Sequence, residues 1–238
     1  MHEYYEKNKD KWLKTMNGYL SLISKELEEK TNKPYVDVLN EVWDVYEKDM
    51  LEYFPYIGGD DVSGTGNLTG SFMLVAMAVV LEKYNVSLDE CGHLMVNCYE
   101  RNFDKMPGIA KKVASLAFGS PKLLNKMFLK KDKQNEENAR KNPGSFETKT
   151  MIPPEEGYYF SYHNLVCPVS NFAKKYGYDK YMPYLCNLDY VMLKAFGVAM
   201  QREHTCFEDG DYCDFKVKKG VKPFETWPPV FQQGKGYK

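Results

Sequence analysis

Apolar residues in the first half of the chain recur at the three- and four-residue spacing of amphipathic helices. Over 1–30 they are Trp12, Leu13, Met16, Leu20, Ile23 and Leu27, with lysine and glutamate at many positions between them. This period is that of one helix face, so we predict a long helix over 1–30 and a second over 35–54. The most apolar segment, 68–84, predicts the central helix of a helical layer. Ser87-Leu88-Asp89-Glu90 has capping-box spacing and predicts the start of another helix.

A glycine-rich segment at 56–67 precedes the apolar helix. It has four glycines within nine residues, and glycine permits backbone conformations that other residues avoid. The segment lacks the preceding strand and the Gly-Lys-Ser/Thr ending of a phosphate-binding loop. We therefore predict a loop that is either the edge of a functional site or a plain connector between helices.

The pattern changes after a highly charged stretch at 130–142, which we interpret as a solvated helix end or a mobile linker. The elements predicted beyond it are strands at 146–152 and 158–166, helices at 168–176 and 180–196, and strands at 198–207 and 212–218 with a turn at 208–211. This ββααββ order predicts an α+β fold, in which a helical N-terminal layer packs with a C-terminal antiparallel sheet that has helices on one face.

The same change of pattern divides the chain. We predict a helical region at 1–142, an α+β region at 143–222 that carries the site, and a C-terminal tail at 223–238, and we expect one compact unit.

Composition narrows the classes of function. The net charge is −1, and without a basic excess we expect no binding to nucleic acid and none to a membrane. The longest apolar run, 72–81, is too short to cross a bilayer. Six cysteines without an export signal predict reduced thiols and a cytoplasmic protein. No Cys-x-x-Cys pair occurs, so we expect neither a metal nor another cofactor.

The first candidate for chemistry is Cys167, at a predicted junction of strand and helix. Pro168 suits the first position of a helix, which makes Cys167 its N-cap. Unpaired N–H groups and the helix dipole there favour the nucleophilic thiolate. His163 lies roughly 13 Å away along an extended strand, too far to be its base. Because free cysteines are commonly packed as small apolar residues, packing remains the alternative for Cys167 and is favoured for Cys186 and Cys206.

Other candidates lie on the second predicted helix and the third predicted strand of this half. Cys186 and Asp189 are three residues apart and share a helix face. Asp189 on an otherwise apolar helix needs a partner or a polar cavity. Alternation along the strand places Arg202 and His204 on one face. Arg202 would pair with a carboxylate such as Asp189 or Glu203, or would bind the carboxylate of a substrate.

Four groups of residues occur in order in this half. They are Asn164-Leu165-Val166-Cys167-Pro168; Tyr184-Leu185-Cys186-Asn187-Leu188-Asp189-Tyr190; Gly197 with Arg202 and Thr205; and Gly210-Asp211-Tyr212-Cys213-Asp214-Phe215. As a set, over 145–218, they resemble the L-2-amino-thiazoline-4-carboxylic acid hydrolase family. The resemblance implies a hydrolase that opens a cyclic amidine, at a carbon–nitrogen bond other than a peptide bond, and yields a carbamoyl-cysteine.

On this resemblance we expect a small-molecule substrate whose sp² carbon is attacked by Cys167. Asp189 or His204 would move the protons and activate water. We expect the substrate-binding residues to be Asn164, Arg202, Cys186 and Cys213.

Two other classes of function remain. A small-molecule binding or sensory domain without turnover is the main alternative, since tyrosine-rich pockets with a few polar anchors suit ligand capture. A metal site is the least favoured, because no pair of cysteines has ligand spacing; its ligands would be Cys167, Cys186, Cys206 and Cys213. An enzyme of the expected kind needs one thiol with a depressed pKa, whereas a binding domain needs none.

Overall fold

The structure is a computed structural model that describes residues 1–234 except 209 and 219. Its helices are α1 Glu3–Lys7, α2 Lys9–Leu20, α3 Ser24–Thr31, α4 Tyr35–Asp49, α5 Ser63–Glu82, α6 Leu88–Asp104, α7 Gly108–Phe118, α8 Pro121–Lys141, α9 Pro168–Tyr176 and α10 Met182–Ala195. Its strands are β1 Glu147–Thr150, β2 Phe160–Val166, β3 Ala199–Gln201 and β4 Cys213–Lys218. Asp209 of the predicted turn and 235–238 of the predicted tail lie outside the described residues.

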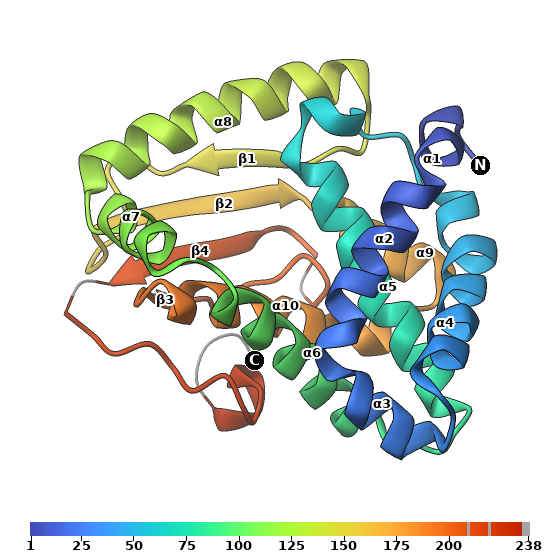
Figure 1. Cartoon of the computed structure of the whole chain (residues 1–238). Coiled ribbons are helices and arrows are strands. Elements are labelled where there is room, and N and C mark those ends of the chain that lie inside the picture. Colours follow the sequence, from blue (N-terminus) through green and yellow to red (C-terminus); the bar gives the residue numbers. More distant parts are fainter. Residues whose placement is uncertain (209, 219, 235–238) are drawn as a thin grey trace.

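The helices α2 to α6 form a layer beside a four-stranded antiparallel sheet (Figure 1). The strand order in the sheet is β1-β2-β4-β3, and along the chain α9, a 3-10 turn and α10 stand between the two pairs of strands. The predicted α+β class is confirmed. Residues of α10 belong to both apolar clusters, with Leu185 and Leu188 in the helical layer and Tyr190 and Leu193 beneath the sheet. Helix α10 therefore joins the two layers.

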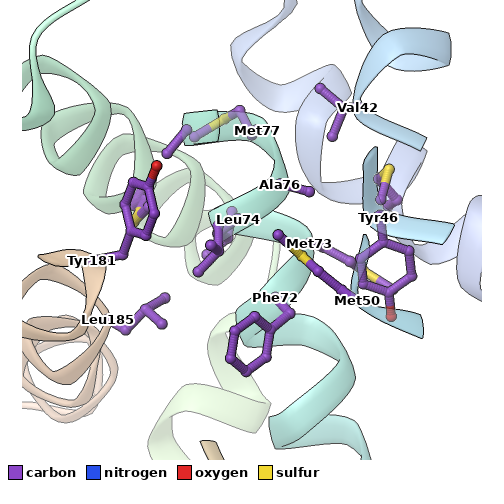
Figure 2. Close-up of a cluster of buried hydrophobic side chains, with 14 of the residues drawn as sticks. Val42, Tyr46, Met50, Phe72, Met73, Leu74, Ala76, Met77, Tyr181 and Leu185 are labelled. Carbon is purple, nitrogen blue, oxygen red and sulfur yellow. The ribbon is translucent and has the colours of Figure 1, made fainter. Parts of the chain in front are cut away.

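Helix α5 is the centre of the helical layer, as its sequence predicts. Figure 2 shows its side chains between Tyr46 and Met50 of the α4 region on one side and Tyr181 and Leu185 on the other. A helix that is apolar on all sides is stable in a folded protein when every side is buried. Within the described residues, α5 alone is long and apolar enough to cross a membrane by length and composition. Its burial among its neighbours accounts for that hydropathy.

Several predicted boundaries agree with the structure. The Ser87 hydroxyl accepts the N–H of Glu90, and the Glu90 carboxylate accepts the N–H of Ser87, so the predicted capping box begins α6. Cys167 is the N-cap of α9, with Pro168 as its first residue, and Gly177 ends that helix with a φ of 77°. The charged stretch at 130–142 is helical through Lys141.

Three predicted elements are wrong in their extent. The helix predicted over 1–30 is broken into α1, α2 and α3. Helix α5 begins at Ser63, five residues before the predicted start. Of the four glycines of the segment 56–67, Gly58 and Gly59 take positive φ values, 115° and 61°, whereas Gly64 and Gly66 are helical. The strand predicted over 198–207 ends at Gln201.

The two faces of the sheet differ in polarity. Phe160 and Tyr162 of β2 face the same side as Phe215 of β4, where Phe128 of α8 and Tyr190 of α10 also lie. Pairing of Tyr162 with Phe215 in the antiparallel register brings their rings into a stack at 4.5 Å. Helices thus cover this face, as predicted.

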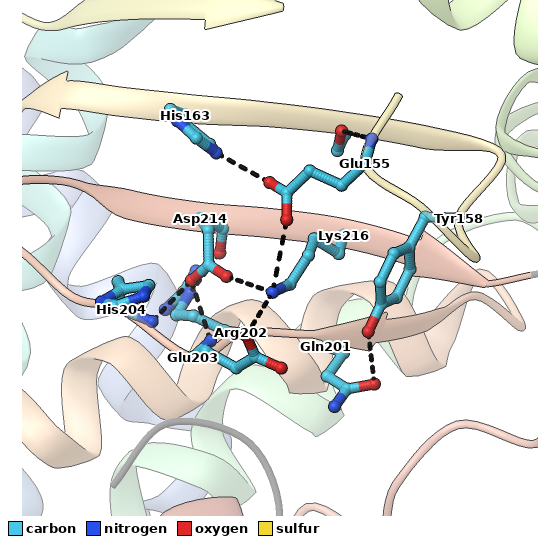
Figure 3. A network of polar contacts seen from close by, with 10 residues as sticks. Glu155, Tyr158, His163, Gln201, Arg202, Glu203, His204, Asp214 and Lys216 are labelled. Carbon is cyan, nitrogen blue, oxygen red and sulfur yellow. Dashed lines mark hydrogen bonds and ion pairs between the residues drawn. The ribbon is translucent and has the colours of Figure 1, made fainter. Parts of the chain in front are cut away.

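The opposite face carries an ion network around the buried side chains of Lys216 and Asp214, which we call the outer network (Figure 3). The Lys216 ammonium lies 2.8 Å from carboxylate oxygens of both Asp214 and Glu203, and 3.5 Å from Glu155. The Asp214 carboxylate also accepts the N–H groups of Glu203 at 2.8 Å and His204 at 2.7 Å. Burial raises the pKa of Asp214, but Lys216 and the two N–H groups lower it by more, so the pKa lies below its usual value. The network fixes the loop after β3 against β4.

The ring of Tyr184 on α10 packs directly against Gly92 on α6, where an added Cβ would overlap it. We expect Gly92→Ala to lower the free energy of unfolding by about 1–3 kcal/mol, because α10 must shift. Gly18→Ala in α2 is the matched control, since no atom lies within 4 Å of its Cβ position, and it should raise stability by up to about 1 kcal/mol. Urea denaturation measures both, and equal effects would contradict the close approach.

Candidate active site

A cavity of about 590 Å³ lies where the helical layer meets the helix-covered face of the sheet. Residues of α2, α5, α8, α10, β2 and β4 form its walls. This volume suits a small molecule. Six of the seven residues predicted for the site line it, namely Asn164, Cys167, Cys186, Asp189, Arg202 and Cys213.

His204, the seventh, lies on the other face of the sheet. Because β3 ends at Gln201, the side chains after it do not keep the alternation of a strand. The centroid of the His204 ring lies 4.9 Å from that of Tyr212. The ring of His163, on the same face of the sheet, stacks on the same tyrosine at 4.4 Å. Figure 3 shows His204 beside Asp214, at the outer network. The prediction that Arg202 and His204 share a face is therefore wrong.

The Arg202 guanidinium is fully buried, with an exposed fraction of 0%. Its Nη2 donates to Asp189 Oδ2 at 2.6 Å, and its Nη1 donates to the carbonyl of Cys186 at 3.4 Å. The guanidinium also stacks on the ring of Phe215 at 3.9 Å. Burial is the largest effect and acts to lower the pKa of Arg202, but Asp189, Cys213, Cys186 and Tyr190 together raise it by more, so the group is a permanent cation. We expected Arg202 either to pair with a carboxylate of the protein or to bind the carboxylate of a substrate. The structure contains the first arrangement, with Asp189 as the partner.

Cys213 is the cavity thiol whose surroundings favour the charged form. The backbone N–H of Cys206 donates to its Sγ at 3.2 Å. The Cys206 side chain has the largest effect and lowers the pKa of Cys213, burial raises it, and the nearby Arg202 lowers it again. The resulting pKa is about 7, so a large fraction of Cys213 is thiolate near neutral pH.

Cys167 has the predicted position but not the predicted acidity. The N–H groups of Val169 and Ser170 lower its pKa, as expected at a helix N-terminus. Burial raises it by more, the charge of Cys213 adds to this, and the pKa of Cys167 rises to about 12. Burial likewise raises the pKa of Cys186 well above its usual value. These pKa values favour the thiolate at Cys213 over the expected thiolate at Cys167.

Lys131 is a cavity residue that our sequence interpretation missed. It lines the cavity from α8, and burial lowers the pKa of its ammonium. Asp132 beside it accepts the N–H of Thr150 and the hydroxyl of Thr148, which fixes α8 against β1. Among the residues that the structure describes, Lys131 makes no ion pair. It lies three residues after the partly buried Phe128 on α8, and this helical spacing from an aromatic residue was the available signal.

The glycine-rich segment also borders the cavity. Ser63, Gly66 and Asn67, from the first turns of α5, line it. A Cβ at Gly66 or Gly70 would meet no atom within 4 Å. We considered this segment as the edge of a site or as a plain connector. Its C-terminal part lies at the edge of the candidate site.

The possible metal site of converging cysteines can be compared with the arrangement of the side chains. All six cysteines are free. Across 1–234, with 209 and 219 left aside, no group of three or more His, Cys, Asp or Glu side chains is arranged to hold a metal ion.

A family model described as L-2-amino-thiazoline-4-carboxylic acid hydrolase matches residues 85–217, more than half of the chain. The chain belongs to this family. Membership in the L-2-amino-thiazoline-4-carboxylic acid hydrolase family indicates a hydrolase-like function in general. The matched region contains all six sequence-predicted residues that line the cavity. No curated protein and no solved structure matches the chain.

The two thiols should differ in their pH dependence of alkylation. We expect the rate of iodoacetamide modification at Cys213 to reach half its maximum near pH 7 and to level off at higher pH, because its pKa is about 7. The rate at Cys167 should still be rising at the most alkaline pH that the fold tolerates, because its pKa is about 12. Peptide mass spectrometry after timed labelling measures both sites in one sample. Faster labelling of Cys167 than of Cys213 at neutral pH would contradict this order.

Proposed function

We propose that this protein hydrolyses a small cyclic amidine that carries a carboxylate, of the 2-amino-thiazoline-4-carboxylate class. The observation that carries the proposal is a thiol favoured as thiolate, Cys213, at the wall of a cavity that also presents one carboxylate and one ammonium group. A nucleophilic thiolate next to an oriented acid–base group is the arrangement that covalent hydrolysis requires.

The charges of the cavity match the charges of such a substrate. Asp189 gives one oxygen to Arg202, and its Oδ1 accepts no hydrogen bond from the described residues. This oxygen can accept hydrogen bonds from the amidine N–H groups. Lys131 is the cavity cation that can bind the substrate carboxylate, because Arg202 already pairs with Asp189. The carboxylate-binding role expected for Arg202 thus passes to Lys131.

The reaction begins with attack by Cys213 Sγ on the sp² carbon between the ring heteroatoms. The bond from that carbon to one ring heteroatom breaks, and this atom leaves with a proton. Water then attacks the same carbon, Asp189 accepts its proton, and the Cys213 thiolate leaves. The water oxygen becomes the carbamoyl oxygen. We propose cleavage of the ring carbon–nitrogen bond, which gives S-carbamoyl-cysteine, whereas carbon–sulfur cleavage would give N-carbamoyl-cysteine.

Cys167 has a different role in this proposal. Because the charge of Cys213 raises the pKa of Cys167, the two thiols do not ionise together near neutral pH. Cys167 remains a neutral thiol at the start of α9, where it can donate a weak hydrogen bond to the substrate.

Single thiol variants test the nucleophile. We expect Cys213→Ala to lower kcat by about 10³-fold or more, because the covalent route is lost. Cys167→Ala should retain activity within about tenfold, since it removes a weak donor only. Cys98→Ala is the matched control, because Cys98 is a buried thiol of the helical layer that does not line the cavity. Chromatography of the carbamoyl-cysteine products measures turnover and identifies the bond that breaks.

Three results would contradict this assignment. Full turnover by folded Cys213→Ala would mean direct attack by water. Loss of turnover in Cys167→Ala alone would return the nucleophile to Cys167. Calorimetric binding of the substrate by the wild-type protein without any turnover would favour a binding domain.

A lysine variant tests substrate binding. We expect Lys131→Met to raise KM by about 10–100-fold with little change in kcat, because it removes one charge-assisted contact to a non-reacting group. The same variant should have almost no effect on 2-amino-thiazoline, which lacks the carboxylate. Lys130→Met changes an exposed neighbour on α8 and is the control. An equal effect on both substrates would contradict the contact.

A further inference from the structure

Helix α7 is apolar but has no buried residue. Ile109, Val113 and Leu116 are 80%, 62% and 74% exposed. With 3.6 residues per turn they fall within about 60° of the helix circumference and so form one apolar stripe. An exposed apolar stripe of this kind marks a contact surface.

The first half of α8 continues this exposed apolar surface. Leu123 and Met127, one turn apart, are exposed by 42% and 50%. Leu124 and Phe128 on the other side of the helix pack beneath the sheet. Helices α7 and α8 are in contact and form a hairpin at the end of the molecule opposite α4 (Figure 1). We call 105–130 the basic hairpin.

The basic hairpin has a strong local charge that the balanced whole chain conceals. From 105 to 130 the chain contains six lysines and no aspartate or glutamate. Lys111 lies 3.4 Å from Asp104. The other five are exposed and form no ion pair with a described residue, namely Lys105, Lys112, Lys122, Lys126 and Lys130.

We propose that the basic hairpin docks on an anionic lipid surface, with the apolar stripe of α7 in the headgroup region and the lysines on the phosphates. Exposed Ile109, Val113 and Leu116 with lysines on the same two helices are typical of helices that lie in a membrane interface. A second copy of this chain fits less well, because two basic hairpins would repel each other. The proposal departs from our expectation of no membrane contact, which rested on the total charge.

The cavity stays accessible in this orientation. Lys131 and Asn135, the cavity residues of α8, follow the basic hairpin along the helix. None of the exposed residues of the apolar stripe lines the cavity. Docking therefore does not depend on the proposed hydrolysis, and each can fail without the other.

Vesicle sedimentation tests the docking with the full chain. The probes are vesicles of phosphatidylcholine alone and vesicles in which phosphatidylglycerol makes up a third of the lipid. We expect at least tenfold tighter binding to the anionic vesicles, and weaker binding as salt is added. Lys112→Glu with Lys126→Glu should reduce that binding by about fivefold or more per lysine. Lys14→Glu, at an exposed lysine of α2, should not change it.

A second pair of variants separates insertion from charge attraction. Ile109→Ser with Leu116→Ser should lower the binding to anionic vesicles at least tenfold, whereas Val36→Ser, 58% exposed on α4, should not. Unchanged binding of the serine variant overturns the insertion of α7. Equal binding to both kinds of vesicle, or to neither, overturns the proposal. Light scattering that finds a dimer which Leu116→Ser disperses would assign the stripe to a second copy.

Discussion

The burial of the Arg202 guanidinium is the constraint on which the site depends. A cation without access to water costs several kcal/mol unless other groups neutralise it and accept its hydrogen bonds. The groups that do so come from α10, through Asp189 and the Cys186 carbonyl, and from β4, through the Asp214 carbonyl and the Phe215 ring. The same charge favours the thiolate at Cys213. One buried cation therefore joins the two layers and adds to the acidity of the proposed nucleophile, to which Cys206 contributes more.

A second buried cation serves a comparable purpose on the opposite face of the same strand. Lys216 is nearly enclosed among carboxylates, and Asp214 fixes the loop after β3 through the N–H groups of Glu203 and His204. This loop also carries Cys206, whose N–H meets Cys213 Sγ. The outer network thus positions a donor for the cavity thiolate without entering the cavity. The order of the loop and the acidity of Cys213 depend on each other.

The sequence predicted what local rules decide. The capping box at Ser87, the N-cap at Cys167 and the buried α5 follow from short-range pattern, and the family motifs identified six residues that meet in the cavity. What failed depends on tertiary structure. His204 was misplaced because the backbone leaves the strand after Gln201. The thiolate was assigned to Cys167 because the helix dipole is visible in the sequence, whereas the burial that outweighs it is not. The charged composition around Lys131 concealed a helix face that packs inward.

The alternation of β4 also limits how the gene for this protein can change in length. Cys213 faces the cavity and Asp214 faces the outer network, and their partners across the sheet are Asn164 and His163. Because side chains alternate, a codon gained or lost at the start of β4 would turn every side chain of the strand to the other face of the sheet. The Asp214 carboxylate and the Lys216 ammonium would then face the cavity, and Cys213 and Phe215 would face the opposite side of the sheet. Substitutions can accumulate one at a time here, but insertions and deletions are tolerated only before the loop or after the strand.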